Sequence, residues 1–174
     1  PDVLAGSVKD QAENVMIVDL MRNDLARVCV PGSVRVPALN RVEEHAVRHL
    51  VSDVVGELRP GVGDGDLLRA TFPPGSVTGA PKVAALRLIN EVETTGREAY
   101  TGAIGYASPA AGLELSVAIR TFELTATKAW LGVGGGITTL SDPAEELAEC
   151  QDKAGPLLSA VGAGATDRKS TRLN

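Results

Sequence analysis

Acidic side chains at helical spacing are the residues of this chain best suited to chemistry. Glu146, Glu149 and Lys153 lie at positions i, i+3 and i+7, so two carboxylates and an ammonium group share one face of a predicted helix. Asp10 and Glu13 place two more carboxylates on another predicted helix. Mg²⁺ is a hard cation that proteins hold through one or two carboxylates together with water and substrate, so these acids could bind it. The alternative is that both stripes are solvated helix faces.

Two further segments could bind an anion. Gly134, Gly135 and Gly136 end a predicted strand, and residues without a Cβ allow backbone N–H groups to approach a carboxylate closely. A simple turn is the alternative there. Residues 78–82 begin a predicted helix, whose free N–H groups and dipole also favour an anion. The segment does not match a nucleotide-binding P-loop, because a valine follows its lysine where that motif needs Ser or Thr.

Three single side chains could contact a substrate. His49 could donate to a substrate oxygen or be a packing residue, and with His45 it makes no zinc hydrolase motif, because Ala46 stands where that motif has Glu. Arg120 lies in a predicted apolar strand, where a cation needs a carboxylate partner unless it faces water. Tyr100 begins another predicted strand, and ordinary β-sheet packing is the alternative explanation for it.

The elements that must position these residues follow from apolar spacing. Helices are predicted from about Ser7, over residues 42–58, from Pro81, and from Asp142 towards residue 158. A short strand is predicted at 34–36 and a surface loop through the glycine-rich residues 61–65. Alternating apolar residues at 100–107, 113–124 and 128–133 predict an antiparallel meander. Helices flanking consecutive strands indicate an α+β fold class.

Composition limits the classes of partner and compartment. A chain of 174 residues with 44% hydrophobic residues fits one domain, or a large piece of one. Lys and Arg number 17 against 22 Asp and Glu, and the resulting net charge of -5 provides no basic surface for nucleic acid or an anionic membrane. The two cysteines are too few for a disulfide framework, which predicts reduced thiols and a cytoplasmic protein. We find no signal peptide and no apolar run long enough to span a bilayer.

Eight motifs, taken in order, resemble the chorismate-binding family, which includes anthranilate, aminodeoxychorismate, isochorismate and salicylate synthases. They are KDQAEN (9–14), VDLMRNDL (18–25), HLVS (49–52), GSVTGAPK (75–82), YTGAIGY (100–106), AIRT (118–121), GGG (134–136) and ELAECQDK (146–153). The resemblance covers nearly all of residues 4–161. It implies an α+β fold in which two antiparallel sheets stack between outer helix layers, with the active site between the sheets. We therefore expect residues 1–162 to be the C-terminal part of a chorismate-binding catalytic domain, and residues 163–174 to be a disordered or foreign tail.

The resemblance also implies residue roles. Glu13 and Glu149 are similar to the Mg²⁺ ligands of the family, with Asp10 and Glu146 as nearby or water-mediated partners. The implied holders of the substrate carboxylates and ring are Arg120, Tyr100 and the backbone of Gly134, Gly135 and Gly136, with Ser76 and Lys153 close by and His49, the candidate catalytic residue, near the ring substituents. Ala148 and Cys150 depart from the Glu and Thr that are common beside the metal-ligating glutamate.

Within the family, residues 18–25 and 49–52 are more similar to aminodeoxychorismate synthases than to anthranilate synthases. The expected reaction joins chorismate to ammonia, supplied from glutamine by an amidotransferase subunit or domain, to form 4-amino-4-deoxychorismate for p-aminobenzoate and folate. The alternatives are the anthranilate-forming reaction, which also releases pyruvate, and a non-catalytic binding module of the same fold. The general acid and the lysine that distinguishes the aminodeoxychorismate enzymes belong to motifs outside this chain, so we expect the chain to be inactive by itself.

Overall fold

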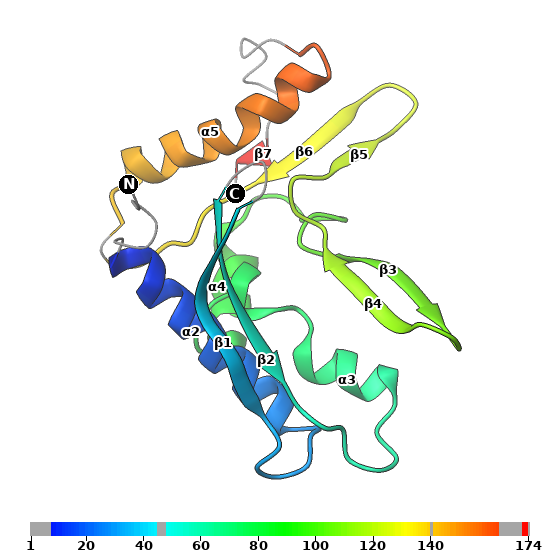
Figure 1. The fold of residues 1–174 in the computed structure, drawn as a ribbon. Helices are drawn as coiled ribbons and strands as arrows, with labels where there is room; N and C mark the ends of the chain where they lie inside the picture. Colours follow the sequence, from blue (N-terminus) through cyan, green and yellow to red (C-terminus); the bar gives the residue numbers. More distant parts are fainter. Residues whose placement is uncertain (1–7, 45–47, 140, 164–171, 174) are drawn as a thin grey trace. The chain divides into compact units, whose positions relative to one another are not determined.

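The computed structural model describes the backbone of residues 8–44, 48–139, 141–163 and 172–173, and the side chains of residues 11–43, 50–139 and 141–163 (Figure 1). The chain divides into two compact units, Pro1–Asn90 and Glu91–Asn174, and each is described by itself below. Helices and small antiparallel sheets occur in the chain, which confirms the predicted α+β class. No helix of the described residues is long and apolar enough to cross a membrane.

The first unit is built on a long helix and a β-hairpin. Helix α2 (Val8–Ala26) packs along the antiparallel pair β1 (Arg35–Glu44) and β2 (Arg48–Val55) (Figure 1). Helix α3 (Asp64–Thr71), the single 3₁₀ turn η1 (Gly75–Val77) and helix α4 (Lys82–Val92) follow in the chain. The helices predicted from about Ser7 and from Pro81 are therefore confirmed as α2 and α4.

A small apolar cluster joins the end of α2 to α3. Cys29 is only 1% exposed and lies with Val28 and Ala70 at the centre of this cluster. A Cβ on Gly56 would lie 2.7 Å from the Cys29 Sγ, so the chain leaving β2 can approach the thiol only because glycine has no side chain. The partly buried residues that pack around the cluster are Leu25, Val34, Val62 and Leu67.

The helix predicted over residues 42–58 is wrong, because most of this segment forms the second half of a hairpin. Val42 pairs with Leu50 and Arg41 with Val51 across the β1–β2 ladder. The apolar residues that suggested a helix are mostly valines, whose branched Cβ loses rotamer freedom in a helix and packs well on a sheet. The short strand predicted at 34–36 is the start of the longer β1.

The loop predicted through residues 61–65 is also partly wrong, because α3 begins inside it. The Gly63 N–H donates to the Asp66 carboxylate at 3.3 Å, and the Asp66 N–H donates to the Gly63 carbonyl at 3.0 Å. Asp64 and Asp66 in the first turn stabilise the helix, because their negative charges lie at the positive end of its dipole. A helix of eight residues is too short to show a clear apolar period in the sequence.

The second unit contains two hairpins and a terminal helix. Strands β3 (Ala103–Ser108) and β4 (Gly112–Val117) form one antiparallel pair, and β5 (Phe122–Leu124) and β6 (Ala129–Val133) form another. The predicted continuous meander is therefore only partly right, because β4 and β5 belong to different sheets and the segment 118–121 interrupts the strand predicted at 113–124. The helix α5 (Pro143–Ala160) packs against β6, as the second cluster of buried residues shows: Leu131, Val133 and Ala154, surrounded by Phe122, Leu157 and Leu158.

The start of α5 agrees with its prediction. Asp142 caps the helix by accepting hydrogen bonds from the backbone N–H groups of Ala144 at 2.9 Å and Glu145 at 3.1 Å, and Pro143 occupies the first helical turn. The predicted tail at 163–174 lies almost wholly outside the described residues. Of its later part, only the backbone of β7 (Arg172–Leu173) is described, and it pairs in parallel with β6.

Candidate functional site

The first two turns of α5 carry the acidic residues that the sequence singled out. Glu146 is only 6% exposed, and its Oε1 accepts a hydrogen bond of 2.5 Å from the Ser141 hydroxyl. Glu149 lies one turn further along and is exposed, with its Oε1 2.5 Å from the Lys153 ammonium. Lys153 Nζ also donates to the carbonyl of Gly134 at 3.3 Å. Two carboxylates and one ammonium group therefore share a face of α5, as their spacing predicted.

The glycine segment after β6 lies against this face of α5. A Cβ on Gly135 would lie 3.0 Å from the Oε2 of Glu146, so a larger residue there would press on the buried carboxylate. Together with the bond from Lys153 to Gly134, this contact brings the backbone of residues 134–136 beside Glu146 and Lys153. In the second unit the structure thus brings together five of the predicted site residues: Gly134, Gly135, Glu146, Glu149 and Lys153.

Tyr100 lies in a turn that precedes β3, not at the start of a strand as predicted. Its backbone N–H donates to the Arg97 carbonyl at 2.9 Å and to the Glu123 carboxylate at 3.2 Å. Its ring covers Gly132 of β6 so closely that a Cβ there would lie 2.3 Å from the Tyr100 Cγ. Burial raises the pKa of the Tyr100 hydroxyl, and the neighbouring Arg97 partly opposes the rise.

An ion pair beside Tyr100 was not predicted from the sequence. Arg97 and Glu93 approach to 2.6 Å, and both side chains are largely buried. The Arg97 guanidinium also donates to the Thr101 hydroxyl at 3.5 Å, and hydrogen bonds to Glu93 raise its pKa. The spacing of four residues between the two charges is the signal that could have identified the pair. The pair fixes the turn that carries Tyr100.

Arg120 was predicted to lie inside a strand, but it lies in the segment between β4 and β5. Its φ of 53° is in the left-handed region, and the chain bends at this residue. The residue is exposed, and within the described residues no hydrogen bond or ion pair joins it to the α5 cluster. Its predicted contact with a substrate carboxylate stays a prediction.

Cys150 follows Glu149 and points into the protein. The side chain is buried, and burial raises the pKa of its thiol, with Lys153 acting in the opposite direction. A neutral, apolar thiol therefore lies beneath the acidic face of α5.

The other predicted site residues belong to the first unit. Glu13 lies on α2 and is half-buried, and Asp10 lies on the same helix, although its side chain is outside the described residues. His49 lies on β2, opposite Glu43, so its predicted helical position is wrong; its side chain and the whole of His45 are outside the described residues. Ser76 is exposed in η1. The predicted meeting of Glu13 with Glu149 stays a prediction, since each belongs to a different unit.

Lys82, at the start of α4, is already paired with an acid. Its ammonium contacts the buried carboxylate of Asp24 on α2 and donates to the Thr71 carbonyl at 3.3 Å. The adjoining η1 also packs closely on α2, because a Cβ on Gly75 would lie 2.7 Å from the Leu20 side chain. The segment 75–82 is therefore held on α2, and the charge of Lys82 is neutralised within the unit.

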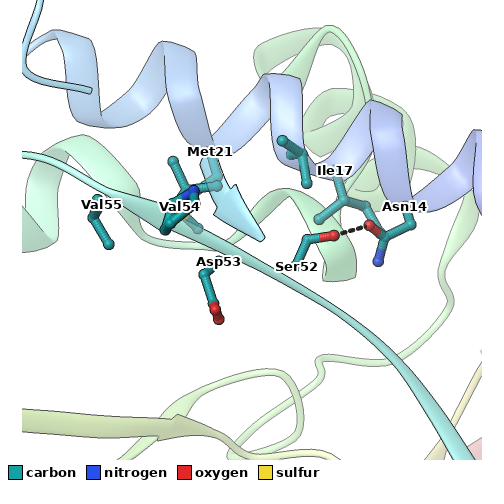
Figure 2. A pocket seen from close by; sticks show the side chains of 9 residues that line it. Asn14, Ile17, Met21, Ser52, Asp53, Val54 and Val55 are labelled. Atoms are coloured by element: carbon teal, nitrogen blue, oxygen red, sulfur yellow. Dashed lines mark hydrogen bonds between the residues drawn. The ribbon is translucent and has the colours of Figure 1, made fainter. Parts of the chain in front are cut away.

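A groove of about 530 Å³ runs between α2 and the hairpin (Figure 2). Figure 2 shows Ser52 pointing towards α2 and Asp53 pointing away from it. The Ser52 hydroxyl donates to the Asn14 side-chain oxygen at 2.5 Å and accepts from the Asn40 N–H at 2.9 Å. None of the groove's lining residues was predicted as a site residue. The position of Asn14, directly after Glu13, is the signal that could have drawn attention to it.

The described acids form no complete metal site by themselves. No group of three or more His, Cys, Asp or Glu side chains suited to a metal ion occurs in the described part of the chain. Glu146 and Glu149 nevertheless provide two carboxylates one turn apart, one of them buried and oriented, which is the number that Mg²⁺ commonly takes from a protein. The donor set of α5 thus fits Mg²⁺ with further oxygen ligands supplied from elsewhere.

Comparison with known proteins gives one consistent result. A sequence profile described as "chorismate binding enzyme" matches residues 2–159. The chain is 49% identical over 156 residues to aminodeoxychorismate synthase component 1 of Salmonella typhimurium, which covers 89% of this chain and 34% of that protein. It is 44% identical over 159 residues to anthranilate synthase component 1 of Aquifex aeolicus, covering 91% of this chain and 32% of that protein.

A solved structure agrees with the sequence matches. The crystal structure of anthranilate synthase component I from Streptococcus pneumoniae matches with a TM-score of 0.80 and 41% sequence identity, covering 88% of this chain and 36% of that one. The chain therefore spans about a third of the length of the curated relatives it matches.

Proposed function

The chain belongs to the chorismate-binding enzyme family, and from that premise we propose that the protein carrying it joins chorismate to ammonia to form 4-amino-4-deoxychorismate. The observation that carries the proposal is the 49% identity, over 89% of this chain, to an aminodeoxychorismate synthase component 1. The motifs at residues 18–25 and 49–52 point the same way. The identity to anthranilate synthase component 1, 44% over 91% of the chain, makes anthranilate formation the second candidate.

The proposed reaction defines what the site must do. The C4–O bond of chorismate breaks, a C4–N bond forms, and the hydroxyl group leaves as water after it receives a proton from a general acid. The enolpyruvyl group stays on the ring in this reaction, whereas anthranilate formation also releases it as pyruvate. Chorismate carries two carboxylates, so the site must neutralise two negative charges and exclude water from the reacting carbon.

We assign the substrate-binding roles as follows. The Arg120 guanidinium and the N–H groups of Gly134, Gly135 and Gly136 would hold one carboxylate. A guanidinium pairs well with a carboxylate, and glycine N–H groups can approach an anion closely because no Cβ is in the way. The bond from Lys153 to Gly134 supports a place for this ammonium next to the glycine segment. Tyr100, Ser76 and His49 are assigned to the surroundings of the ring, with His49 as the candidate catalytic residue.

The metal-binding role falls to the acids of the two helices. Glu13 and Glu149 would hold Mg²⁺, with Asp10 and Glu146 as nearby or water-mediated partners. When bound, the ion would neutralise the ring carboxylate of chorismate and fix its position. Within this chain, the burial of Glu146 and the ion pair between Lys153 and Glu149 keep the carboxylates of α5 in place.

Ammonia is proposed to come from a partner. The relatives' designation as component 1 indicates a second component, which we infer to be a glutamine amidotransferase subunit or domain. Free ammonium salts should then replace glutamine in the assay, because the chorismate site needs only ammonia itself.

The experiment that tests the proposal measures products from the intact protein. The full-length protein is incubated with chorismate, an ammonium salt and Mg²⁺, and chorismate, pyruvate and anthranilate fluorescence are followed together. Consumption of chorismate without pyruvate or anthranilate is the expected result. One equivalent of pyruvate for each chorismate consumed would instead establish the anthranilate reaction. A folded protein that binds chorismate but never consumes it would show that the fold serves as a binding module.

A further inference from the structure

Ser141 has no assigned role so far, yet its hydroxyl makes a short hydrogen bond to the acidic face of α5. We infer that Ser141 is a positioning residue that fixes the carboxylate of Glu146 for the metal and substrate site. This inference rests on the proposed function. The Ser141 Oγ lies 2.5 Å from the Glu146 Oε1, in a turn that directly precedes the helix.

The direction of this hydrogen bond is set by the turn itself. The Thr138 N–H donates to the Ser141 Oγ at 3.0 Å, and the Ser141 N–H donates to the Thr138 carbonyl at 3.1 Å. A hydroxyl has one hydrogen to donate, and since its oxygen already accepts from Thr138, that hydrogen is directed at the carboxylate. Hydrogen bonds to an ionised acceptor are shorter and stronger than neutral ones. The hydrogen bonds with Thr138 therefore orient the Ser141 hydroxyl towards Glu146.

The carboxylate is confined on its other side as well. Glu146 is buried, and a Cβ on Gly135 would lie 3.0 Å from its Oε2, so this oxygen lies next to the glycine segment. A glutamate side chain has three rotatable bonds and normally samples several rotamers. Burial and the hydrogen bond from Ser141 restrict Glu146 to few of these rotamers, as a metal partner in a precise geometry requires.

The neighbouring Asp142 provides a control, because it fixes a different part of the same turn. Asp142 accepts from the backbone N–H groups of Ala144 and Glu145 and so stabilises the start of α5. Both of these hydrogen bonds are made to backbone groups and not to the Glu146 side chain. Loss of Asp142 should weaken the helix, whereas loss of the Ser141 hydroxyl should release the Glu146 side chain.

The test compares Ser141→Ala, Ser141→Thr and Asp142→Ala in the full-length protein. Mn²⁺, used as a spectroscopic substitute for Mg²⁺, is titrated with detection by electron paramagnetic resonance, and urea unfolding is measured in parallel. We expect Ser141→Ala to weaken Mn²⁺ binding by about 10-fold or more, the range seen when a hydrogen-bond partner of a metal ligand is lost. Ser141→Thr, which keeps the hydroxyl, should bind Mn²⁺ nearly as well as the wild type. Asp142→Ala should unfold at lower urea with little change in Mn²⁺ affinity.

Two results would overturn the inference: unchanged Mn²⁺ affinity in Ser141→Ala, or an equal loss of affinity in Asp142→Ala. A wild-type protein that binds no Mn²⁺ would instead refute the metal site of the proposed function. In that case a crystal structure of Ser141→Ala tests the positioning role of Ser141 independently of metal binding. A Glu146 side chain in its original orientation would refute the positioning role, and a displaced one would support it.

Discussion

At the residue scale, two of the side chains that matter most depend on glycines that let other groups come near. Gly132 leaves the space occupied by the ring of Tyr100, and Gly135 leaves the space beside the Glu146 carboxylate. The sequence pointed to Tyr100 and Glu146 through their motifs. It could not identify Gly132 as the neighbour of Tyr100, because this contact joins a turn to a strand that lies far along the chain.

Replacing Gly132 with alanine should therefore displace Tyr100. The new methyl group would overlap the ring, and crowding of this kind costs about 1–3 kcal/mol of folding free energy. We expect a lower urea midpoint and, in the full-length protein, weaker chorismate binding in an equilibrium titration. Gly155→Ala is the matched control, because no atom lies within 4 Å of a Cβ built there. In a helix interior that change should stabilise the protein by up to about 1 kcal/mol. Equal behaviour of the two variants would contradict the packing of Tyr100 on Gly132.

The buried hydroxyl of Tyr100 gives a second, pH-dependent prediction. Its pKa is raised from the ordinary value of 10.0, mainly by burial, so the folded protein holds the proton more tightly than the unfolded chain. The stability from the neutral hydroxyl is fully present below about pH 10 and is lost as the pH rises through the folded pKa. In the 174-residue chain with Tyr106→Phe, Tyr100 is the only tyrosine, and phenolate absorbance should appear at higher pH in the folded chain than in urea. If the titration curves of the folded and the urea-unfolded chain coincided, the burial of the Tyr100 hydroxyl would be contradicted.

At the element scale, the pairing of segments decided structure where local pattern was ambiguous. Residues 42–58 carry apolar side chains at spacings that suit a helix, yet they form β2 and its surroundings because β1 offers a complementary edge. Helices α2, α4 and α5 were predictable since each has a start signal, and α4 and α5 also have an apolar face. The hairpin was not predictable in the same way, because its pairing depends on cross-strand contacts and on α2, which the spacing of apolar residues within one segment does not show.

The ion pair between Asp24 of α2 and Lys82 of α4 is the contact that we expect to matter most in the first unit. Removing one partner with Lys82→Met would leave a buried carboxylate without its cation, at a cost of about 3–5 kcal/mol in unfolding free energy. The double variant Asp24→Leu with Lys82→Met should recover much of that loss, since no buried charge remains. Urea unfolding of the single and double variants measures both effects. A double variant as unstable as Lys82→Met would show that the loss of stability does not come from the unpaired carboxylate of Asp24.

At the scale of the whole molecule, the sequence predicted the fold class and family well and the details of the site less well. Ordered motifs were sufficient for the family because they extend over nearly the whole chain, and the profile match to residues 2–159 confirms it. The roles of Arg120 and Glu13 stay predictions. Both would meet their partners through contacts between distant parts of the chain, which local spacing does not determine.

Exposed apolar residues lead to a prediction about the 174-residue chain studied by itself. Several large side chains are more than half exposed, among them Val83, Leu88, Val92, Ile104 and Tyr106. The chain also spans about a third of the relatives it matches. We therefore expect the isolated chain to bind a hydrophobic dye strongly and to show no turnover of chorismate with ammonium and Mg²⁺, in contrast to the full-length protein. Turnover by the isolated chain would refute the assignment of the general acid to a segment outside it.

The buried thiol of Cys150 has a practical consequence. Since burial raises its pKa, almost none of it is thiolate at neutral pH, and the thiolate is the form that peroxides and alkylating drugs attack. The helix with the acidic face is thus protected from oxidative damage at Cys150. A reagent that reacts with thiols would therefore modify Cys150 only slowly in the folded protein.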